Sequence, residues 1–137
     1  MAEFFAAPGD IEAAAITYLK PFFPGCVVTT RRPFGTDWQN PPAGTCIIRV
    51  QVVAGEEPRS LVLDPWTLAV EVWHPDSTQA ANKAGAVSGR LNAWQGSGAG
   101  LLVYECRATR PRSVPDPLTA VPRYLMTAAG TARLMGV

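Results

Sequence analysis

One continuous stretch, Leu61 to Trp94, decides the fold of this chain: LVLDPWTLAVEVWHPDSTQAANKAGAVSGRLNAW. In its first half, Leu68, Val70 and Val72 fall at every second position, which is the period of a β-strand with one buried face. After the sequence His74–Pro75–Asp76–Ser77 the apolar period changes to steps of three and four. The members of this second set are Ala80, Ala84, Val87, Leu91 and Trp94. A strand that leads directly into an amphipathic helix predicts a sheet with a helix packed against it.

The composition suits one domain. With 137 residues, 47% of them hydrophobic, the chain is long enough to bury a substantial core, and we expect a single domain over residues 1–137. Charged residues make up 17% of the chain, below the roughly one quarter that is usual for soluble domains. So little charge fits two alternatives: an ordinary Ala-rich domain, or a protein whose surface is partly covered by partners.

The charge balance and the hydropathy exclude some classes of partner. The net charge is +1, from 12 basic and 11 acidic residues, which disfavours a dedicated nucleic-acid binder and a polybasic membrane anchor. No run approaches the roughly 18 apolar residues of a membrane-spanning helix, and the N-terminal sequence does not resemble a signal peptide. We therefore expect a protein that is made in the cytoplasm and has no membrane partner.

The flanking sequence predicts further elements around the strand–helix unit. Asp10 is a suitable N-cap for a helix over residues 11–20, and a second helix is expected over 76–95. The expected strands cover residues 26–31, 45–53, 61–73, 101–109 and 122–133. The order α-β-β-β-α-β-β predicts an α+β fold, with a small antiparallel or mixed sheet flanked by two helices.

Three local sequences modify this outline. Asp64–Pro65 predicts a bulge or bend in the strand over 61–73. Gly85 and Gly89 weaken the second helix, and close packing against a neighbouring backbone would explain them. The glycines of residues 96–100 follow a helix and precede a strand, which is the wrong order for a phosphate-binding loop, so we expect a turn there.

The residues that could carry chemistry give little support to catalysis. Cys26, Cys46 and Cys106 are odd in number and form no CxxC motif, so we expect buried, reduced thiols and neither a metal site nor a cofactor. A small hydrolase or transferase that uses Cys106 or His74 stays open as an alternative, and it requires a thiol with a depressed pKa.

Two further groups of residues have alternative interpretations. Trp66, Trp73 and Trp94 are expected in the core, although a small-ligand binding module could also use them. Arg107, Arg110 and Arg112 lie around Pro111, either in a solvated loop or in a segment that docks on an acidic partner.

Two blocks carry a resemblance to a known family. The first is Asp64–Trp73, DPWTLAVEVW, and the second is Ser113–Pro117, SVPDP, followed by Pro122–Arg123–Tyr124. With the N-terminal helix that ends in Leu-Lys-Pro and the Ala-rich second helix, the chain resembles the tail terminator proteins of long-tailed, siphovirus-type phages of actinobacteria, over nearly its whole length.

The resemblance implies a structural virion protein. Such a protein forms a ring, of six subunits, that caps the head-proximal end of the tail tube, stops tube polymerisation and joins the tail to head-completion proteins. It implies contacts with the major tail tube protein and with a head-completion or connector protein, and DNA that passes through the lumen without sequence readout. Another neck subunit, of similar size and also without catalytic residues, is the nearest alternative.

A ring subunit needs a heterologous interface that closes on itself. The last strand, from Tyr124 to Thr131 and including Met126, is our candidate for an edge strand shared between neighbours. Because it is poor in β-branched residues, we expect it to order only in the ring. The segments 33–44 and 110–121 are expected to contact the tube or neck, with Trp38, Arg110 and Arg112 as anchors, since Trp and Arg dominate interface hot spots.

Overall fold

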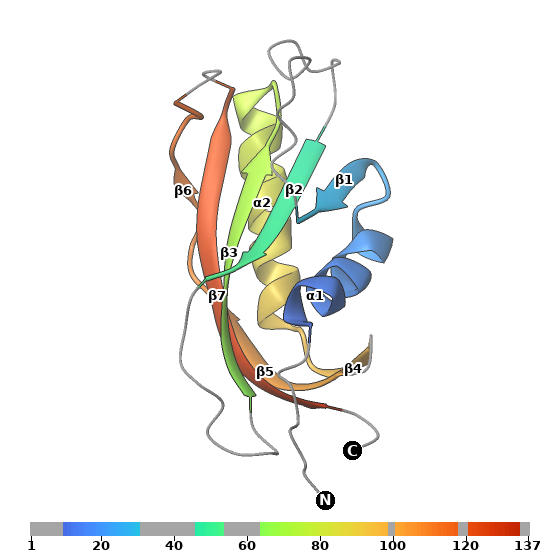
Figure 1. The fold of residues 1–137 in the computed structure, drawn as a ribbon. Coiled ribbons are helices and arrows are strands. Elements are labelled where there is room, and N and C mark those ends of the chain that lie inside the picture. The colour runs from blue at the N-terminus through green and yellow to red at the C-terminus, as the bar shows by residue number, and fades with distance from the viewer. Residues whose placement is uncertain (1–9, 31–45, 54–63, 99–100, 118–120, 135–137) are drawn as a thin grey trace, which may run out of the picture.

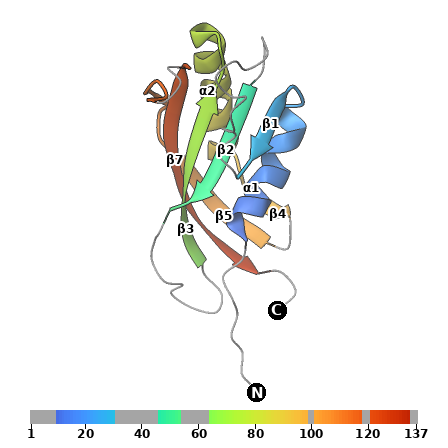
Figure 2. The same ribbon diagram turned by 45° about the horizontal axis from the view of Figure 1, so that its top comes forward.

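A computed structural model describes residues 10–30, 46–53, 64–98, 101–117 and 121–134. Two helices lie on one face of a curled sheet, and β5 and β4 bend round toward α1 (Figures 1 and 2). The elements are α1 (Ile11–Leu19), the 3₁₀ turn η1 (Lys20–Phe22), β1 (Cys26–Thr29), β2 (Cys46–Val52), β3 (Asp64–Trp73), α2 (Ser77–Asn92), β4 (Gly96–Gly98), β5 (Leu101–Ala108), β6 (Arg112–Ser113) and β7 (Arg123–Leu134). The expected α+β class and the order of the two helices and five longer strands are confirmed; β4 and β6 are additional short strands.

Both helices begin where capping chemistry predicts. The Asp10 carboxylate accepts a hydrogen bond from the Ala13 N–H at 3.0 Å, and the Asp76 carboxylate accepts one from the Thr78 N–H at 2.9 Å. Each bond satisfies an N–H that has no partner inside its helix. At the other end of α2, Gly96 has φ +118, and from there the chain enters β4. The turn expected over residues 96–100 is therefore wrong for its first three residues.

The strand order is β1-β2-β3-β7-β5-β4, and β6 pairs with β7 outside this path. Among the strands that the structure describes, the β1–β2 pair alone is parallel, so the sheet is mixed. The register of β3 on β7 runs from Asp64↔Ala132 to Trp73↔Arg123 without a shift. The bend expected at Asp64–Pro65 is therefore wrong; the irregularity lies in β5, between Val103 and Glu105.

The last strand corrects the expected mode of assembly. β7 lies between β3 and β5, so it is an interior strand, and its expected role as a shared edge is wrong. The expectation that it orders only in a ring is also wrong, because its ladders form within one chain. Small residues such as Ala128 and Gly130 are poor strand formers, but pairing on both sides and burial outweigh that local preference.

The helix-covered side of the sheet, here called the inner face, holds the main core. Leu68, Val70 and Val72 of β3 are fully buried beneath α2, as the alternation predicts. The predicted apolar face of α2 is also buried, with Ala80, Ala84, Val87 and Leu91 0% exposed. The helix expected to reach residue 95 ends at Asn92, so Trp94, which is 5% exposed, packs from the segment after the helix. The strand–helix unit therefore folds as its two periods indicate.

Gly130 is the tightest point of this core. Its register partner is Trp66, and a Cβ built on Gly130 would lie 2.6 Å from the Trp66 ring and even closer to the Glu105 carbonyl oxygen at the irregularity in β5. Only glycine leaves space for both groups. By contrast, a Cβ at Gly85 or Gly89 would meet nothing within 4 Å. The expected close backbone packing at these two glycines is therefore wrong.

Side chains from the helices occupy parts of the sheet edges. The Glu12 carboxylate of α1 accepts a hydrogen bond from the Val52 N–H at 2.7 Å, beyond the end of the β1–β2 ladder. On β5, the Asn92 side chain accepts from the Ala108 N–H at 2.9 Å and donates to its carbonyl at 3.5 Å, and Gln95 donates to the Tyr104 carbonyl at 3.2 Å. These contacts block strand addition at both places.

Candidate functional site: the outer face of the sheet

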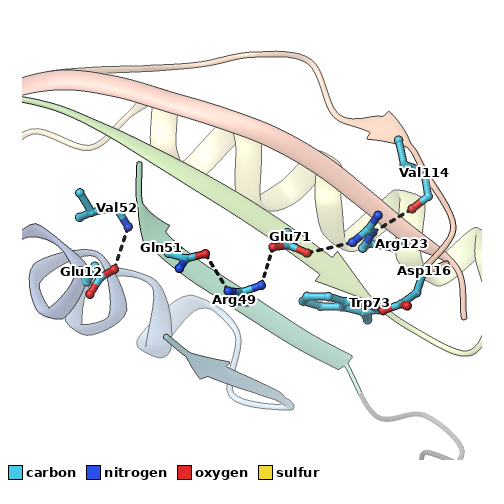
Figure 3. A network of polar contacts seen from close by, with 9 residues as sticks. All are labelled: Glu12, Arg49, Gln51, Val52, Glu71, Trp73, Val114, Asp116 and Arg123. Atoms are coloured by element: carbon cyan, nitrogen blue, oxygen red, sulfur yellow. Dashed lines mark hydrogen bonds and ion pairs between the residues drawn. The ribbon is translucent and has the colours of Figure 1, made fainter. Parts of the chain in front are cut away.

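The side of the sheet away from the helices, here called the outer face, carries a polar network across three strands (Figure 3). Glu71 of β3 accepts from Arg49 Nη1 of β2 at 3.0 Å and from Arg123 Nη1 of β7 at 3.2 Å. Arg49 and Glu71 are direct register partners, and Arg49 also donates to Gln51 at 2.7 Å. Side-chain exposure is 16% for Arg49 and 13% for Glu71 and Arg123, so both ion pairs are largely shielded from solvent.

A strap made of residues 112–117 and Val121 folds back beside this network. Arg123 Nε donates to the Val114 carbonyl at 2.9 Å, and the Trp73 indole N–H donates to the Asp116 carboxylate at 3.0 Å (Figure 3). Asp116 is 1% exposed and Trp73 is 0% exposed. A carboxylate so deeply buried requires hydrogen-bond partners, and the indole N–H is one of them. Ile47, Trp73 and Val121 form a separate buried cluster on this face.

The two sequence blocks that carry the family resemblance meet at this place. Glu71 and Trp73 belong to the first block, while Asp116 and Arg123 belong to the second. The structure joins them through one ion pair and one buried hydrogen bond, although the partners are 52 and 43 residues apart. The blocks are therefore halves of one structural unit.

Beside the network lies an open hollow of about 570 Å³. We call it the outer hollow; the residues around it that matter here are Ala69, Glu71, Arg110, Arg112, Arg123 and Leu125. Arg110 and Arg112 are exposed, and neither side chain has a hydrogen-bond or ion-pair partner within the described ranges. The hollow thus combines an apolar floor with two uncommitted guanidinium groups.

The residues expected at the assembly interface fall into three environments. Arg110 and Arg112 come together at the outer hollow. Met126 is 4% exposed and Tyr124 packs in part against the inner-face core, so neither lies on an open strand edge. Trp38 lies outside the described residues. The sequence analysis did not single out Arg49, Glu71 and Arg123. The pattern that could have identified them is a charged residue at an alternate position of an otherwise apolar strand.

The three cysteines differ in their ionisation. Burial raises the pKa of the Cys106 thiol to about 12, which does not support Cys106 as a nucleophile. Cys26 and Cys46 are register partners on β1 and β2. A hydrogen bond from the Cys46 thiol lowers the pKa of Cys26 to about 7, and the same bond, together with burial, raises that of Cys46. The depressed pKa that the enzyme alternative requires therefore occurs at Cys26 and not at Cys106.

His74 has a structural contact at the start of α2. Its ring Nδ1 accepts a hydrogen bond from the Asp76 N–H at 2.9 Å, and the residue is 7% exposed. This bond fixes the turn that leads from β3 into α2. Across the described ranges, no group of three or more His, Cys, Asp or Glu side chains is placed to hold a metal ion.

The tryptophans named for the ligand-binding alternative are packing residues. Trp94 stacks on Tyr18 with ring centroids 5.1 Å apart and contacts Trp66 at 5.6 Å. Trp66 is 7% exposed, and Trp73 is fully buried on the opposite face. The expected core placement is confirmed for all three. Trp94 also borders a hollow of about 280 Å³ beside Tyr18 and Phe22.

Comparisons with known proteins place the fold. None of the helices that the structure describes is long and apolar enough to cross a membrane. Neither a protein-family model nor a curated protein sequence matches the chain. Among solved structures, the chain is similar to one in the virion of a native gene transfer agent particle, with a TM-score of 0.58 and 14% identity over 89% of this chain and 93% of that chain. This likeness shows a shared fold along nearly the full length of both chains.

Proposed function

We propose that this chain is a structural protein of a phage or phage-like virion and, more specifically, a tail terminator. In this proposal it forms a ring at the head-proximal end of the tail, stops polymerisation of the tube, and joins the tail to the head-completion proteins. The chain is assembled into the virion in the host cytoplasm. DNA passes through the lumen without sequence readout, and the role is structural rather than enzymatic.

The contact between the two resemblance blocks carries this proposal. Here Glu71 pairs with Arg123, and Trp73 donates to Asp116, within one side of the sheet. The shared fold with a chain of a gene transfer agent virion supports the coarser part of the proposal, a structural virion protein, because it spans nearly the full length of both chains.

The ring requires two different surfaces on each subunit that fit each other in neighbouring copies. Because β7 is an interior strand paired on both sides, we propose side-chain contacts rather than a shared last strand as the main ring interface. Arg110 and Arg112 at the outer hollow, with Trp38, remain the proposed contacts with a neighbour, the tube or the neck.

Electron microscopy of particles made when the gene is silenced in its parent phage tests the proposal. Overlong, headless tails beside DNA-filled, tailless heads are the expected result. Empty tailless heads beside free tails of normal length would instead assign the chain to head completion. Intact virions in normal numbers would contradict a structural role and would bring the reactive Cys26 thiol into consideration.

A further inference from the structure

The outer hollow differs from the rest of the surface in the charge it presents. Three arginines, Arg110, Arg112 and Arg123, face it against one glutamate, Glu71. On the helix side, the described charged residues are balanced, three acidic against three basic: Asp10, Glu12, Asp76, Lys20, Lys83 and Arg90. Among the described residues, three guanidinium groups thus gather around one carboxylate at the hollow, which favours an anionic partner there.

The arginines around the hollow have different tasks. Arg123 is fully engaged: its Nη1 contacts Glu71 at 3.2 Å, and its Nε donates to the Val114 carbonyl at 2.9 Å. It therefore holds the strap against the sheet. Arg110 and Arg112 extend from that strap region without partners in the described part of the chain. A planar guanidinium without a partner is suited to bidentate binding of a carboxylate.

We propose that the outer hollow is a docking site for an acidic peptide segment of a partner protein. A carboxylate side chain of the segment pairs with Arg110 and Arg112. An apolar side chain beside it covers Leu125 and Ala69 on the floor. The inference rests on the proposed function and deepens it, since it states the chemistry that a tube or neck partner must offer to this face.

The floor of the hollow favours a protein over a nucleic acid. Nucleic-acid binding is dominated by many cation–phosphate contacts along an extended basic surface. Here the cations are few, the chain carries a net charge of only +1, and the surface between them is apolar. Protein interfaces combine such an apolar centre with arginines at the rim.

A binding measurement on the purified full chain tests the inference. The probe is a fluorescein-labelled peptide of alternating Glu and Leu, followed by anisotropy, with the Gln–Leu peptide as its uncharged counterpart. We expect the acidic peptide to bind and the Gln peptide to bind at least about tenfold more weakly. The double variant Arg110→Gln/Arg112→Gln should weaken binding of the acidic peptide by about tenfold or more. The matched double variant Lys20→Gln/Lys83→Gln, which removes the same charge from the helix side, should bind like the parent chain.

Thermal melting of both double variants establishes that they fold equally well. Equal binding of the Glu and Gln peptides would overturn the inference, and so would an equal loss of peptide affinity in both double variants. A double-stranded oligonucleotide that binds more tightly than the peptide, and depends on the same two arginines, would also overturn it. Competition by inorganic phosphate at the concentration at which the free peptide competes would also overturn it, by showing anion binding only.

The result is separable from the tail terminator role. Overlong tails on silencing, combined with no peptide binding, would retain the terminator proposal and remove the docking site. Specific peptide binding combined with intact virions on silencing would retain the docking site and remove the terminator role.

Discussion

The two faces of one sheet use the same strands in opposite ways. On β3, Leu68 and Val70 point to the inner face and are fully buried under α2, whereas Ala69 and Glu71 point to the outer face and border an open hollow. The inner face is closed by apolar packing beneath α2. The outer face is held by a few shielded ion pairs and hydrogen bonds, and within the described residues it leaves the side chains of Arg110 and Arg112 without a partner.

This difference separates what stabilises the fold from what can serve assembly. Apolar burial contributes most of the folding free energy, and this contribution does not depend on whether a partner is bound. An ion pair with limited exposure contributes less but fixes geometry, here the position of the strap that bears Arg112. Changes on the inner face should therefore affect stability, and changes at the outer hollow should affect association.

The largest expected effect is a difference in labelling rate between two cysteines of the inner face. We expect a thiol reagent to reach this face only at its β1 end, where Cys26 lies. At about pH 7, iodoacetamide should label Cys26 at least about a hundredfold faster than Cys106, because Cys26 has a pKa of about 7 and Cys106 one of about 12. Since a lowered pKa yields thiolate at lower pH, labelling of Cys26 should rise through about pH 7 and then level off. Mass spectrometry of tryptic peptides measures both rates.

A variant sharpens the assignment of that thiol. Cys46→Ala removes the hydrogen bond that lowers the pKa of Cys26, so the midpoint of the labelling profile should move to higher pH. An unchanged midpoint would show that the Cys46 thiol does not lower the pKa of Cys26. Rapid labelling of Cys106 in the native protein would show that the inner face is open beyond β1.

The tightest point of the inner face should give the largest change in stability. Gly130→Ala places a methyl group against the Glu105 carbonyl and the Trp66 ring, and we expect it to lower the free energy of unfolding by about 3 kcal/mol. Gly85→Ala is the matched control. With open space around it in α2, it should raise stability by about 0.5–1 kcal/mol through helix propensity. Urea denaturation measures both, and equal effects would refute the packing difference.

The outer network should contribute less. Glu71→Gln removes the charge that Arg49 and Arg123 share, leaving two shielded guanidinium groups without a counterion. We expect a loss of about 2 kcal/mol in urea denaturation. Glu105→Gln, an exposed carboxylate on β5, should change stability by less than about 0.5 kcal/mol. A loss at Glu71 no larger than at Glu105 would mean that the network does not hold the outer face.

The smallest effect tests the edge of β5. Asn92→Ala removes the paired hydrogen bonds to Ala108, while Asn82→Ala changes an exposed position of the same helix. Asn92 is the last residue of α2 and also donates to the Ser88 carbonyl at 3.1 Å, so the difference between the two variants reports all the side-chain hydrogen bonds of Asn92 together. We expect Asn92→Ala to be less stable than Asn82→Ala by about 1 kcal/mol. Identical stabilities would show that the Asn92 side chain does not support the edge.

The sequence by itself determined the elements that local periodicity encodes. The alternation in Leu68–Val72 and the helical spacing from Ala80 to Leu91 correctly predicted β3, α2 and the face that each buries, although α2 ends before Trp94. Asp10 correctly predicted the start of α1, and the start expected at residue 76 coincides with the N-cap of α2. These features depend on residues a few positions apart, so the chain carries them without reference to the rest of the fold.

Only the tertiary structure decided which strands are neighbours and which side chains meet. It placed β7 inside the sheet, joined Glu71 to Arg123 and Trp73 to Asp116, and set Cys26 beside Cys46. Strand pairing depends on contacts between distant segments, and a strand with a weak local preference becomes stable once both its neighbours are present. For that reason the poor β-forming sequence of β7 gave the wrong expectation of an open edge, and the outer hollow became visible only in the folded chain.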